Sequence, residues 1–234
     1  MKKNSIKLQK ERNARLVSII TPTYNRRKFI PNLIKCIEAQ THKEFEWIIL
    51  DDGTDKIGDL VKHLSYVNYQ SLEKKLTLGE KRNRANDLAR GSYLIYFDDD
   101  DYHFPSRISH SIEVLKTTPE AFIVGSSSMY IYYSKMDALY TTKDFNAQHA
   151  TAGTFCFRKS LLSLTKFENK AERSEERFFL KDYTIKMAQL DFNQTIIINA
   201  HDSNTFDKSN LLGTKTLEPT EKKISDICPD WFFE

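Results

Sequence analysis

Short apolar segments alternate with segments of helical period in the first half of this chain, and this alternation restricts the fold more than any other feature. Four segments rich in β-branched and aromatic residues are bounded by turn residues and are too short for helices: residues 17–20, 47–50, 93–97 and 122–124. Between them, apolar residues recur at helical spacing over residues 29–37, 60–64 and 108–115. This alternation predicts a layered α/β fold with a mostly parallel central sheet flanked by helices.

The second half of the chain is organised differently. The pattern predicts short, Tyr-rich strands over 129–133 and 154–157, a charged helix over about 175–190, and a last strand over 195–198. We expect this small mixed region to shape a substrate pocket. The polar tail that follows ends in Trp231-Phe232-Phe233, which would dock either on the body of the protein or on a partner.

The composition narrows the classes of function. With 234 residues, 40% of them hydrophobic, the chain fits one large domain or two small ones with a substantial core. Lys and Arg total 35 against 32 Asp and Glu, so no overall charge favours nucleic acid as a partner. The first 15 residues are locally basic and are expected to form a disordered arm.

Cysteine usage and hydropathy bear on the compartment. Cys36, Cys156 and Cys228 are odd in number and widely spaced, which argues against a disulfide framework and a zinc site and favours a reducing cytoplasm. No apolar stretch approaches the roughly 18 to 20 residues that span a bilayer, and the N-terminus lacks the apolar block of a signal peptide. We therefore expect a cytoplasmic protein without a membrane span.

Four consecutive carboxylates, Asp98 to Asp101, follow the apolar run 93–97, so a buried strand is expected to end in dense negative charge. Two like charges about 4 Å apart repel by about 1 kcal/mol in water and about 4 kcal/mol near a protein surface, so the cluster requires a cation or raised pKa values. Oxygen donors suit a hard ion, Mg²⁺ or Mn²⁺. A solvated acidic turn before a helix near Pro105 is the alternative, and four aspartates in a row favour the metal.

Polar segments follow three of the predicted strands. Residues 21–26 follow the first strand, residues 51–55 the second, and the four aspartates the third strongly predicted one. In an open parallel sheet, ligands collect outside the carboxyl ends of the strands. We therefore expect these three segments to line one crevice.

Four motifs occur in order: T-P-T-Y-N-R at 21–26, L-D-D-G-T-D at 50–55, L-G-E-K-R-N-R-A at 78–85, and G-S-Y-L-I-Y-F-D-D-D-D-Y-H-F-P-S-R at 91–107. Together they resemble the nucleotide-binding half of a family 2 glycosyltransferase with the GT-A fold, closely over residues 16–128 and loosely over 150–213. The resemblance implies a nucleotide-sugar donor, a divalent metal and transfer with inversion at the anomeric carbon. We then expect a basic arm (1–15), one GT-A domain and a C-terminal tail (214–234). The domain consists of a nucleotide-sugar-binding half (16–128) and an acceptor and catalytic half (129–213).

Donor binding can be assigned to particular side chains beside this resemblance. The carboxylate of Asp52 can accept the imide N–H of uracil and the ring of Tyr24 can stack on the base, which favours a UDP-linked donor, although a carboxylate equally takes two donors from guanine. Arg82, close to Gly79, offers a guanidinium to the pyrophosphate. A turn-forming aspartate, ordinary aromatic packing and an exposed basic helical turn are the respective alternatives. The expected nucleotide-binding residues are Thr21, Pro22, Thr23, Tyr24, Arg26, Asp52, Gly79, Arg82, Asp98 and Asp99.

The resemblance also implies a set of metal ligands. In the family pattern the first and third aspartates contact ribose and metal, and they correspond to Asp98 and Asp100. A late histidine completes the metal shell in many GT-A enzymes, which makes His201 the third ligand of Mn²⁺ or Mg²⁺, with His103 as a weaker alternative. An ordinary surface histidine is the other interpretation of His201. The polar loop 202–207 after it is expected to close over the donor as a lid.

A carboxylate base is expected at the start of the charged helix. Inverting members of the family use a carboxylate from an E-D pair that leads a helix, and Glu175-Glu176 resembles this pair with glutamate in place of aspartate. Glu176 is the first candidate for the base, with Glu175 and Asp182 as rivals. Burial beside an apolar wall would raise the pKa of such a base and help it accept a proton. A merely charged helix face is the alternative interpretation.

We therefore predict a metal-dependent inverting glycosyltransferase of hexosyltransferase type, acting on a glycan, protein or lipid-linked acceptor. A nucleotidyltransferase is one alternative, but it usually carries a Gly-rich phosphate loop where this chain has residues 21–26. A non-catalytic nucleotide-sugar or glycan-binding module of the same fold is another, and it would release no diphosphate. No G-x-G-x-x-G follows the first strand, which disfavours a dinucleotide oxidoreductase. The sequence leaves the acceptor and the oligomeric state open, and a homo-oligomer is one of the possible states. Residues 151–154 are placed near the acceptor only by their position in the chain.

Overall fold

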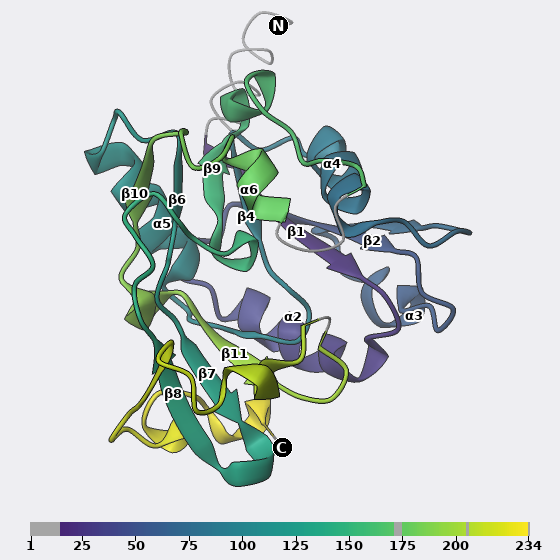
Figure 1. The fold of residues 1–234 in the computed structure, drawn as a ribbon. Helices are drawn as coiled ribbons and strands as arrows, with labels where there is room; N and C mark the ends of the chain where they lie inside the picture. Colours follow the sequence, from purple (N-terminus) through teal and green to yellow (C-terminus); the bar gives the residue numbers. More distant parts are fainter. Residues whose placement is uncertain (1–14, 171–174, 205, 234) are drawn as a thin grey trace, which may run out of the picture.

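Two sheets and the helices around them organise the computed structural model, which describes residues 15–170, 175–204 and 206–233 (Figure 1). In these residues, a seven-stranded sheet has the order β10-β6-β9-β4-β1-β2-β3 and a five-stranded sheet the order β12-β8-β7-β11-β5. The first sheet contains β1 (Val17–Thr23), β2 (Phe45–Asp51), β3 (Val67–Ser71), β4 (Tyr93–Tyr96), β6 (Ile123–Gly125), β9 (Cys156–Arg158) and β10 (Met187–Gln189). The second contains β5 (Tyr102–His103), β7 (Tyr130–Tyr133), β8 (Ala138–Thr142), β11 (Ile196–Ala200) and β12 (Leu217–Pro219).

Helices connect and cover these strands. The α-helices are α2 (Ile30–Glu38), α3 (Gly58–Val61), α4 (Leu78–Leu88), α5 (Arg107–Thr117) and α6 (Glu175–Phe179). Short 3₁₀ helices cover Arg27–Phe29, Ser134–Met136, Ala152–Thr154, Lys159–Ser163, Phe192–Gln194, Lys208–Leu211, Ile224–Asp226 and Asp230–Phe232. No helix in the described part of the chain is long and apolar enough to cross a bilayer.

The large sheet is mostly parallel. Strand β1 lies between β2 and β4, with Ile19 opposite Trp47 on one side and Ile95 on the other. Only the pairs that β9 makes with β4 and β6 are antiparallel in this sheet as described. The carboxyl ends of β1, β2, β3, β4, β6 and β10 therefore meet at one edge, and the predicted α/β fold with a mostly parallel central sheet is confirmed.

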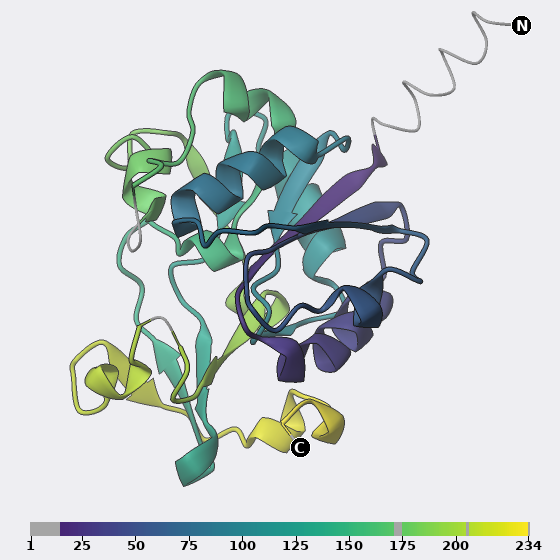
Figure 2. The ribbon, with the colours of Figure 1, turned by 90° about the vertical axis from the view of Figure 1, so that its right-hand side faces the viewer.

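The two faces of this sheet pack against different helices, as Figures 1 and 2 show. Ile19 of β1 belongs to the cluster that includes the apolar residues of α2 and α5, such as Leu33 and Ile112. Its neighbour Ile20 belongs to the opposite cluster, with Ala85 of α4 and Phe179 of α6. Because successive strand side chains point to opposite faces, a strand of this kind is apolar throughout, which is why it is visible in the sequence.

The C-terminal tail docks on the body of the protein. The ring of Phe232 lies 5.3 Å from that of Tyr102 in β5, and the ring of Phe233 lies 4.5 Å from that of Tyr132 in β7. Asn32 of α2 donates a hydrogen bond to the carbonyl of Phe232 at 2.8 Å, and Figure 2 shows the tail beneath α2. The sequence predicted that these aromatic residues dock either on the body of the protein or on a partner, and the described structure shows them on the body.

One predicted element is wrong. The charged helix expected over about 175–190 ends at Phe179, and β10 begins at Met187. Lys181, Asp182 and Tyr183 have φ angles of 49°, 53° and 64°, in the left-handed region that a right-handed helix cannot enter. The predicted N-terminal arm lies outside the described residues except for Arg15.

Candidate active site

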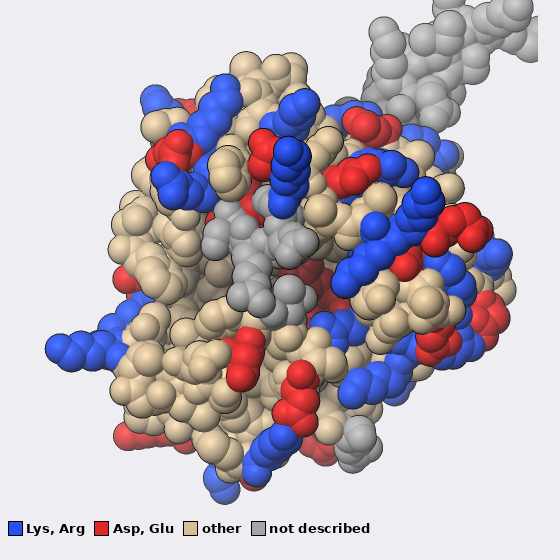
Figure 3. Space-filling model, turned by 45° about the vertical axis from the view of Figure 1, so that its right-hand side comes forward, with Lys and Arg blue, Asp and Glu red and all other residues tan. Residues whose placement is uncertain are grey.

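The four aspartates lie at the carboxyl end of β4, in the loop between β4 and β5. Asp99 and Asp101 accept hydrogen bonds from different strands, and Arg26 lies near two of the carboxylates. The hydroxyl of Thr23, the last residue of β1, donates to Asp99 at 2.6 Å, and the backbone N–H of Asn199 in β11 donates to Asp101 at 3.2 Å. Arg26 lies 3.8 Å from the Asp99 carboxylate and 3.7 Å from that of Asp100. Figure 3 shows carboxylates in the hollow beside the residues drawn in grey.

The surroundings of these carboxyl groups shift their pKa values in different directions. Burial and the charge of Asp100 raise the pKa of Asp99 well above its ordinary value, and the same causes raise that of Asp101. Burial also opposes ionisation of Asp100, but the hydrogen bond from His201 and the charge of Arg26 outweigh it and lower its pKa. The predicted raised pKa values therefore occur within the cluster, and Asp100 is its most acidic buried member.

Asp100 and His201 form the part of the site that best fits a cation. The His201 Nε2 lies 3.0 Å from Asp100 Oδ2. Two neighbouring ligands of an octahedral ion with bonds of about 2.1 Å are about 3 Å apart, so the spacing of this pair suits Mg²⁺ or Mn²⁺. In this structure Asn204 Nδ2 lies 3.2 Å from Asp100 Oδ2 and 3.1 Å from His201 Nε2. Asp98 is turned toward Arg82 instead, and no three Asp, Glu, His or Cys side chains of the described residues are gathered around a common point. Mg²⁺ commonly takes one or two protein ligands and completes its shell with water and phosphate oxygens.

His103 is buried inside the protein and stabilises the acidic loop rather than facing a ligand. It is 1% exposed, and its ring stacks on Phe97 with centroids 4.0 Å apart. Burial and the charge of Arg107 lower the pKa of His103 well below its ordinary value, so the ring is neutral. Its Nδ1 accepts from Arg107 at 2.6 Å, which leaves Nε2 to donate to the carbonyl of Asp98 at 2.9 Å.

The buried Arg107 ties together the backbone around the cluster. It donates to the carbonyl of Tyr96 at 2.7 Å and to that of Gly153 at 2.6 Å. Gly153 approaches the cluster closely, since a Cβ at this position would lie 2.6 Å from Asp98 Oδ2. Arg107 thus fixes both the strand end and the segment that faces Asp98.

The predicted nucleoside-binding residues lie beyond β1 and β2. Asp52 is buried, and its carboxylate forms an ion pair with Lys81 of α4 and accepts from the backbone N–H of Leu76 at 2.7 Å. The ring of Tyr24 is covered by Lys75, whose Nζ lies 4.2 Å from the ring centroid. The two residues are therefore brought to the same end of the crevice.

Thr21 differs from the other members of this group. Its hydroxyl donates to the carbonyl of Phe97 at 2.8 Å and accepts from the indole N–H of Trp47 at 2.9 Å, inside the core. Gly79 is buried in the first turn of α4, and Pro22 is half-buried at the end of β1. The structure thus assigns Thr21 contacts within the protein.

Arg82 connects the acidic cluster to Glu175-Glu176, the pair of glutamates that contains the predicted general base. Its guanidinium donates to Asp98 at 3.3 Å and to Glu175 at 3.2 Å, and it lies 4.4 Å from the centroid of the Tyr96 ring. Arg82 is 2% exposed, and among the described residues its Nη1 has no hydrogen-bond partner. The sequence placed this arginine at the pyrophosphate, and the structure places it between two carboxylates.

The three candidate bases differ in environment. Glu175 is buried and paired with Arg82. Glu176 is half-buried, and burial together with the charge of Glu175 raises its pKa. Asp182 is 72% exposed and paired with Arg177 at 2.6 Å. Of the three, only Glu175 contacts the crevice directly, through Arg82, and Glu176 follows it in α6 with the raised pKa expected of a base.

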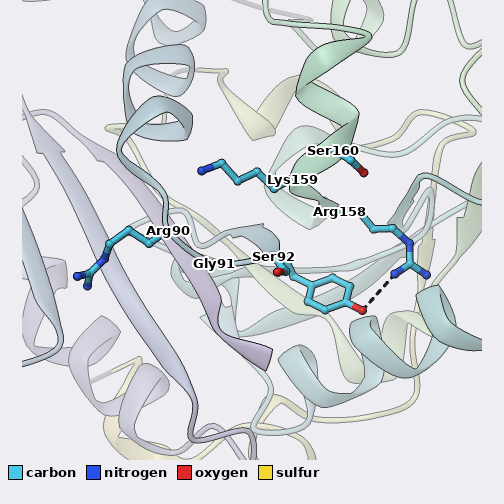
Figure 4. A pocket seen from close by; sticks show the side chains of 7 residues that line it. Arg90, Gly91, Ser92, Arg158, Lys159 and Ser160 are labelled. Atoms are coloured by element: carbon cyan, nitrogen blue, oxygen red, sulfur yellow. Dashed lines mark hydrogen bonds between the residues drawn. The ribbon is translucent and has the colours of Figure 1, made fainter. Parts of the chain in front are cut away.

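A pocket of about 320 Å³ lies at the other edge of the sheet (Figure 4). Arg90, Arg158 and Lys159 line it, but their charged ends point apart. Arg158 donates to the carbonyl of Leu115 at 2.6 Å, and Lys159 donates to that of Ala89 at 2.5 Å. These two cations bind carbonyls at the C-terminal ends of α5 and α4 and do not converge on a ligand.

Comparison with known proteins identifies the family of this chain. The family model for glycosyl transferase family 2 matches residues 18–177. This chain belongs to that family. The family 2 resemblance inferred from the four motifs is thus confirmed.

Relatives and solved structures extend this result. AmsB, an amylovoran biosynthesis glycosyltransferase of Erwinia amylovora, is 26% identical over 185 residues, which cover 72% of this chain and 62% of AmsB. TarS 1–349 of S. aureus in complex with UDP-GlcNAc has a TM-score of 0.67 at 20% identity, covering 81% of this chain and 60% of TarS 1–349. The mannosyltransferase PcManGT of Pyrobaculum calidifontis, in complex with GDP-Man and Mn²⁺, has a TM-score of 0.65 at 14% identity, covering 81% of this chain and 58% of PcManGT. These structures confirm the GT-A fold.

The aligned part is shorter than the relatives themselves. It spans 36%, 44% and 62% of the length of three curated relatives, an uncharacterized glycosyltransferase of Haemophilus influenzae, TuaG of Bacillus subtilis, and AmsB. The family is therefore established on a domain, while the donor and acceptor of this protein are matters for proposal.

Several supporting residues were not predicted from the sequence. Lys81 pairs with Asp52, Lys75 covers Tyr24, and Arg107 holds the acidic loop. One signal existed for Arg107, because it directly precedes Ile108 on the apolar face of a predicted helix. For Lys81 and Lys75 no signal existed, since both lie in runs of charged residues.

Proposed function

We propose that this protein is an inverting glycosyltransferase that moves a hexosyl group from a nucleotide-diphosphate sugar, UDP-linked, to an acceptor hydroxyl in the presence of Mn²⁺ or Mg²⁺. The observation that best supports this is the order of groups along the carboxyl edge of the sheet. Asp52 lies beyond β2, the acidic cluster beyond β4, and Glu175-Glu176 on α6, linked to the cluster by Arg82.

The nucleoside end would be formed by Tyr24 and Asp52. The base stacks on Tyr24 in the place that Lys75 occupies, so donor binding displaces this lysine. The Asp52 carboxylate binds Lys81 and Leu76, and its side chain has no exposed surface, so an N–H of the base reaches its remaining acceptor positions only when donor binding opens these contacts. UDP is preferred because TarS 1–349 is described with UDP-GlcNAc, and the GDP-Man complex of PcManGT makes GDP the alternative.

The diphosphate would lie over the acidic cluster. Asp100 and His201 would hold the cation, and Asp98 would contact the donor. When bound, the cation neutralises charge on the departing diphosphate. The Mn²⁺ complex of PcManGT supports the use of a divalent cation. Arg82 is a positioning residue here, because it holds Asp98 and Glu175 at fixed places.

Glu176 would accept the proton of the acceptor hydroxyl. As the hydroxyl oxygen forms a bond to the anomeric carbon, the bond from this carbon to the diphosphate breaks on the opposite face, which inverts the configuration. The raised pKa of Glu176 favours proton uptake. We also propose a cytoplasmic location, which the three free, buried cysteines support.

The test is a panel of UDP- and GDP-sugars, assayed with Mn²⁺ for release of the nucleoside diphosphate. We expect release from at least one donor, loss of release in Glu176→Gln, and retained release in the exposed control Asp182→Asn. The absence of release from every donor, with the nucleotide still bound, would instead establish a non-catalytic binding module.

A further inference from the structure

One end of the carboxyl edge is left unused by the groups assigned above. The nucleoside residues lie beyond β1 and β2, and the acidic cluster lies beyond β4. In the sheet order, β9, β6 and β10 continue on the other side of β4. A molecule that meets the sugar from the side opposite the nucleotide would therefore lie on the β6 and β10 side of the acidic cluster.

Three aromatic side chains form a cluster on this side, beside the edge strand β10. The rings of Phe145 and His149 have centroids 4.8 Å apart, and those of His149 and Tyr183 have centroids 5.4 Å apart. Phe145 is 55% exposed although it is fully apolar. The Nδ1 of His149 is buried and has no hydrogen-bond partner in the described structure. The cluster thus combines an exposed ring with an unused hydrogen-bonding group.

The cluster is held in place by backbone contacts. The Gln189 side chain at the end of β10 donates to the carbonyls of Ala147 and His149 at 3.0 and 2.9 Å. These bonds fix the segment that carries Phe145 and His149 against the edge strand. The same segment continues to Gly153, which faces Asp98. The aromatic cluster and the acidic cluster are therefore joined by a short, fixed piece of chain.

Tyr183 reaches the cluster through a strained turn. Three consecutive residues, Lys181, Asp182 and Tyr183, have positive φ, which costs about 1 to 2 kcal/mol for each residue that is not glycine. Hydrogen bonds from Asp182 N to the Arg177 carbonyl at 2.9 Å and from Thr184 N to the Leu180 carbonyl at 3.0 Å hold the turn. Strained backbone of this kind gathers at functional sites. The charge of Glu176 also acts on Tyr183 and contributes, after burial, to the raised pKa of its hydroxyl.

We propose that Phe145, His149 and Tyr183 form a subsite that binds a pyranose ring of the acceptor, a proposal that rests on the proposed function. The C–H face of a sugar ring is apolar and packs on aromatic rings, while its hydroxyls require hydrogen-bond partners. The exposed ring of Phe145 supplies the apolar surface, and the unpaired Nδ1 of His149 supplies a partner. A ring bound here directs a hydroxyl toward Glu176. The acceptor class is therefore a glycan.

Binding can be tested without any donor. Methyl glycosides of glucose, galactose, mannose and N-acetylglucosamine are mixed with the protein, and saturation-transfer NMR reports which ones bind. Phe122 is the matched control, because it is a 42% exposed phenylalanine just before β6 whose ring is not part of the three-ring cluster. We expect signal from at least one glycoside, about tenfold weaker binding in Phe145→Ala, which corresponds to a loss of about 1.4 kcal/mol, and wild-type binding in Phe122→Ala.

Two outcomes would overturn the subsite: no signal from any of the four glycosides, or equal binding by Phe145→Ala and the wild type. His149→Phe, which keeps an aromatic ring but removes Nδ1, is expected to bind more weakly as well, and unchanged binding would exclude the hydrogen bond. Release of nucleoside diphosphate to water, measured without acceptor, tests the proposed transferase alone. A protein that releases nucleotide but binds no glycoside would keep the proposed function and lose the subsite.

Discussion

Arg82 of α4 and Glu175 of α6 form a buried ion pair, 3.2 Å from Nε to Oε1, between residues 93 positions apart in the chain. The same guanidinium reaches Asp98, so one cation neutralises a carboxylate of the acidic cluster and a carboxylate beside the candidate base. This arrangement links the two halves of the crevice through a single side chain.

Replacing Arg82 should affect both halves at once. Arg82→Gln leaves Glu175 buried without its counter-charge, and breaking a buried pair in this way costs about 3 to 5 kcal/mol. Denaturant unfolding measures this loss. The control Arg84→Gln removes a 52% exposed cation of the same helix and should change the unfolding free energy by less than about 0.5 kcal/mol. Equal stability of the two variants would show that the bridge contributes little.

The pH dependence of transfer should report Glu176. Its pKa is raised by burial and by the charge of Glu175, so activity should rise with pH as Glu176 loses its proton, above the ordinary range of a glutamate. Glu175→Gln removes one repulsive charge and leaves Arg82 less neutralised, and both changes lower the pKa of Glu176. The acid limb of the kcat profile should then move to lower pH. A limb that stays in place would assign the titration to another group.

Asp99→Asn should stabilise the protein at neutral pH. The folded pKa of Asp99 is raised, so the folded state holds a proton that the unfolded state releases, and stability falls as pH rises from about 3.9, the ordinary pKa of aspartate. The variant removes this cost and should be more stable than the wild type at pH 8, with no gain at pH 3. Thermal unfolding at the two pH values measures it. The exposed control Asp55→Asn should show no such dependence, and an equal gain by both variants would contradict the explanation.

The strands of the central sheet could be predicted because burial on both faces makes them continuously apolar. The edge strand Val67–Ser71 escaped prediction because it is only half-buried and carries the polar residues Asn68 and Gln70. The helix expected over 175–190 failed for another reason, since local backbone hydrogen bonds to the carbonyls of Arg177 and Leu180 hold a left-handed turn at 181–183 that no glycine announces.

Some residues of the site could likewise be predicted from the sequence, and others could not. The acidic cluster and Asp52 were predictable because each follows an apolar strand, which fixes its place at the sheet edge. The role of Arg82 was not, because the run Glu80 to Arg84 does not say which side chains of α4 face the sheet. Packing against β1 and β2 buries Lys81 and Arg82 and leaves Arg84 exposed. Which side chains of α4 are buried therefore depends on the tertiary packing and cannot be taken from the local sequence.

His103 should act through the backbone of Asp98. His103→Phe keeps the stack on Phe97 but removes the acceptor of a buried Arg107 N–H, and a lost hydrogen bond to a charged group costs about 1.5 to 3 kcal/mol. His103→Gln, which can both donate and accept, should recover part of this stability and lower the KM for the donor relative to His103→Phe. Chemical denaturation and donor kinetics give the two readouts. Full activity and stability of His103→Phe would remove the supporting role.

The most direct test of the central claim is calorimetric titration of UDP, with GDP as the second arm, in the presence and absence of Mn²⁺. The claim is that Asp100 and His201 hold a cation that anchors the diphosphate. The wild type should bind one of the two nucleotides at least about tenfold more tightly with Mn²⁺, a difference of about 1.4 kcal/mol, and Asp100→Asn should lose this difference. Binding of the nucleotide with the same affinity with and without Mn²⁺, or an undiminished Mn²⁺ effect in Asp100→Asn, would contradict it.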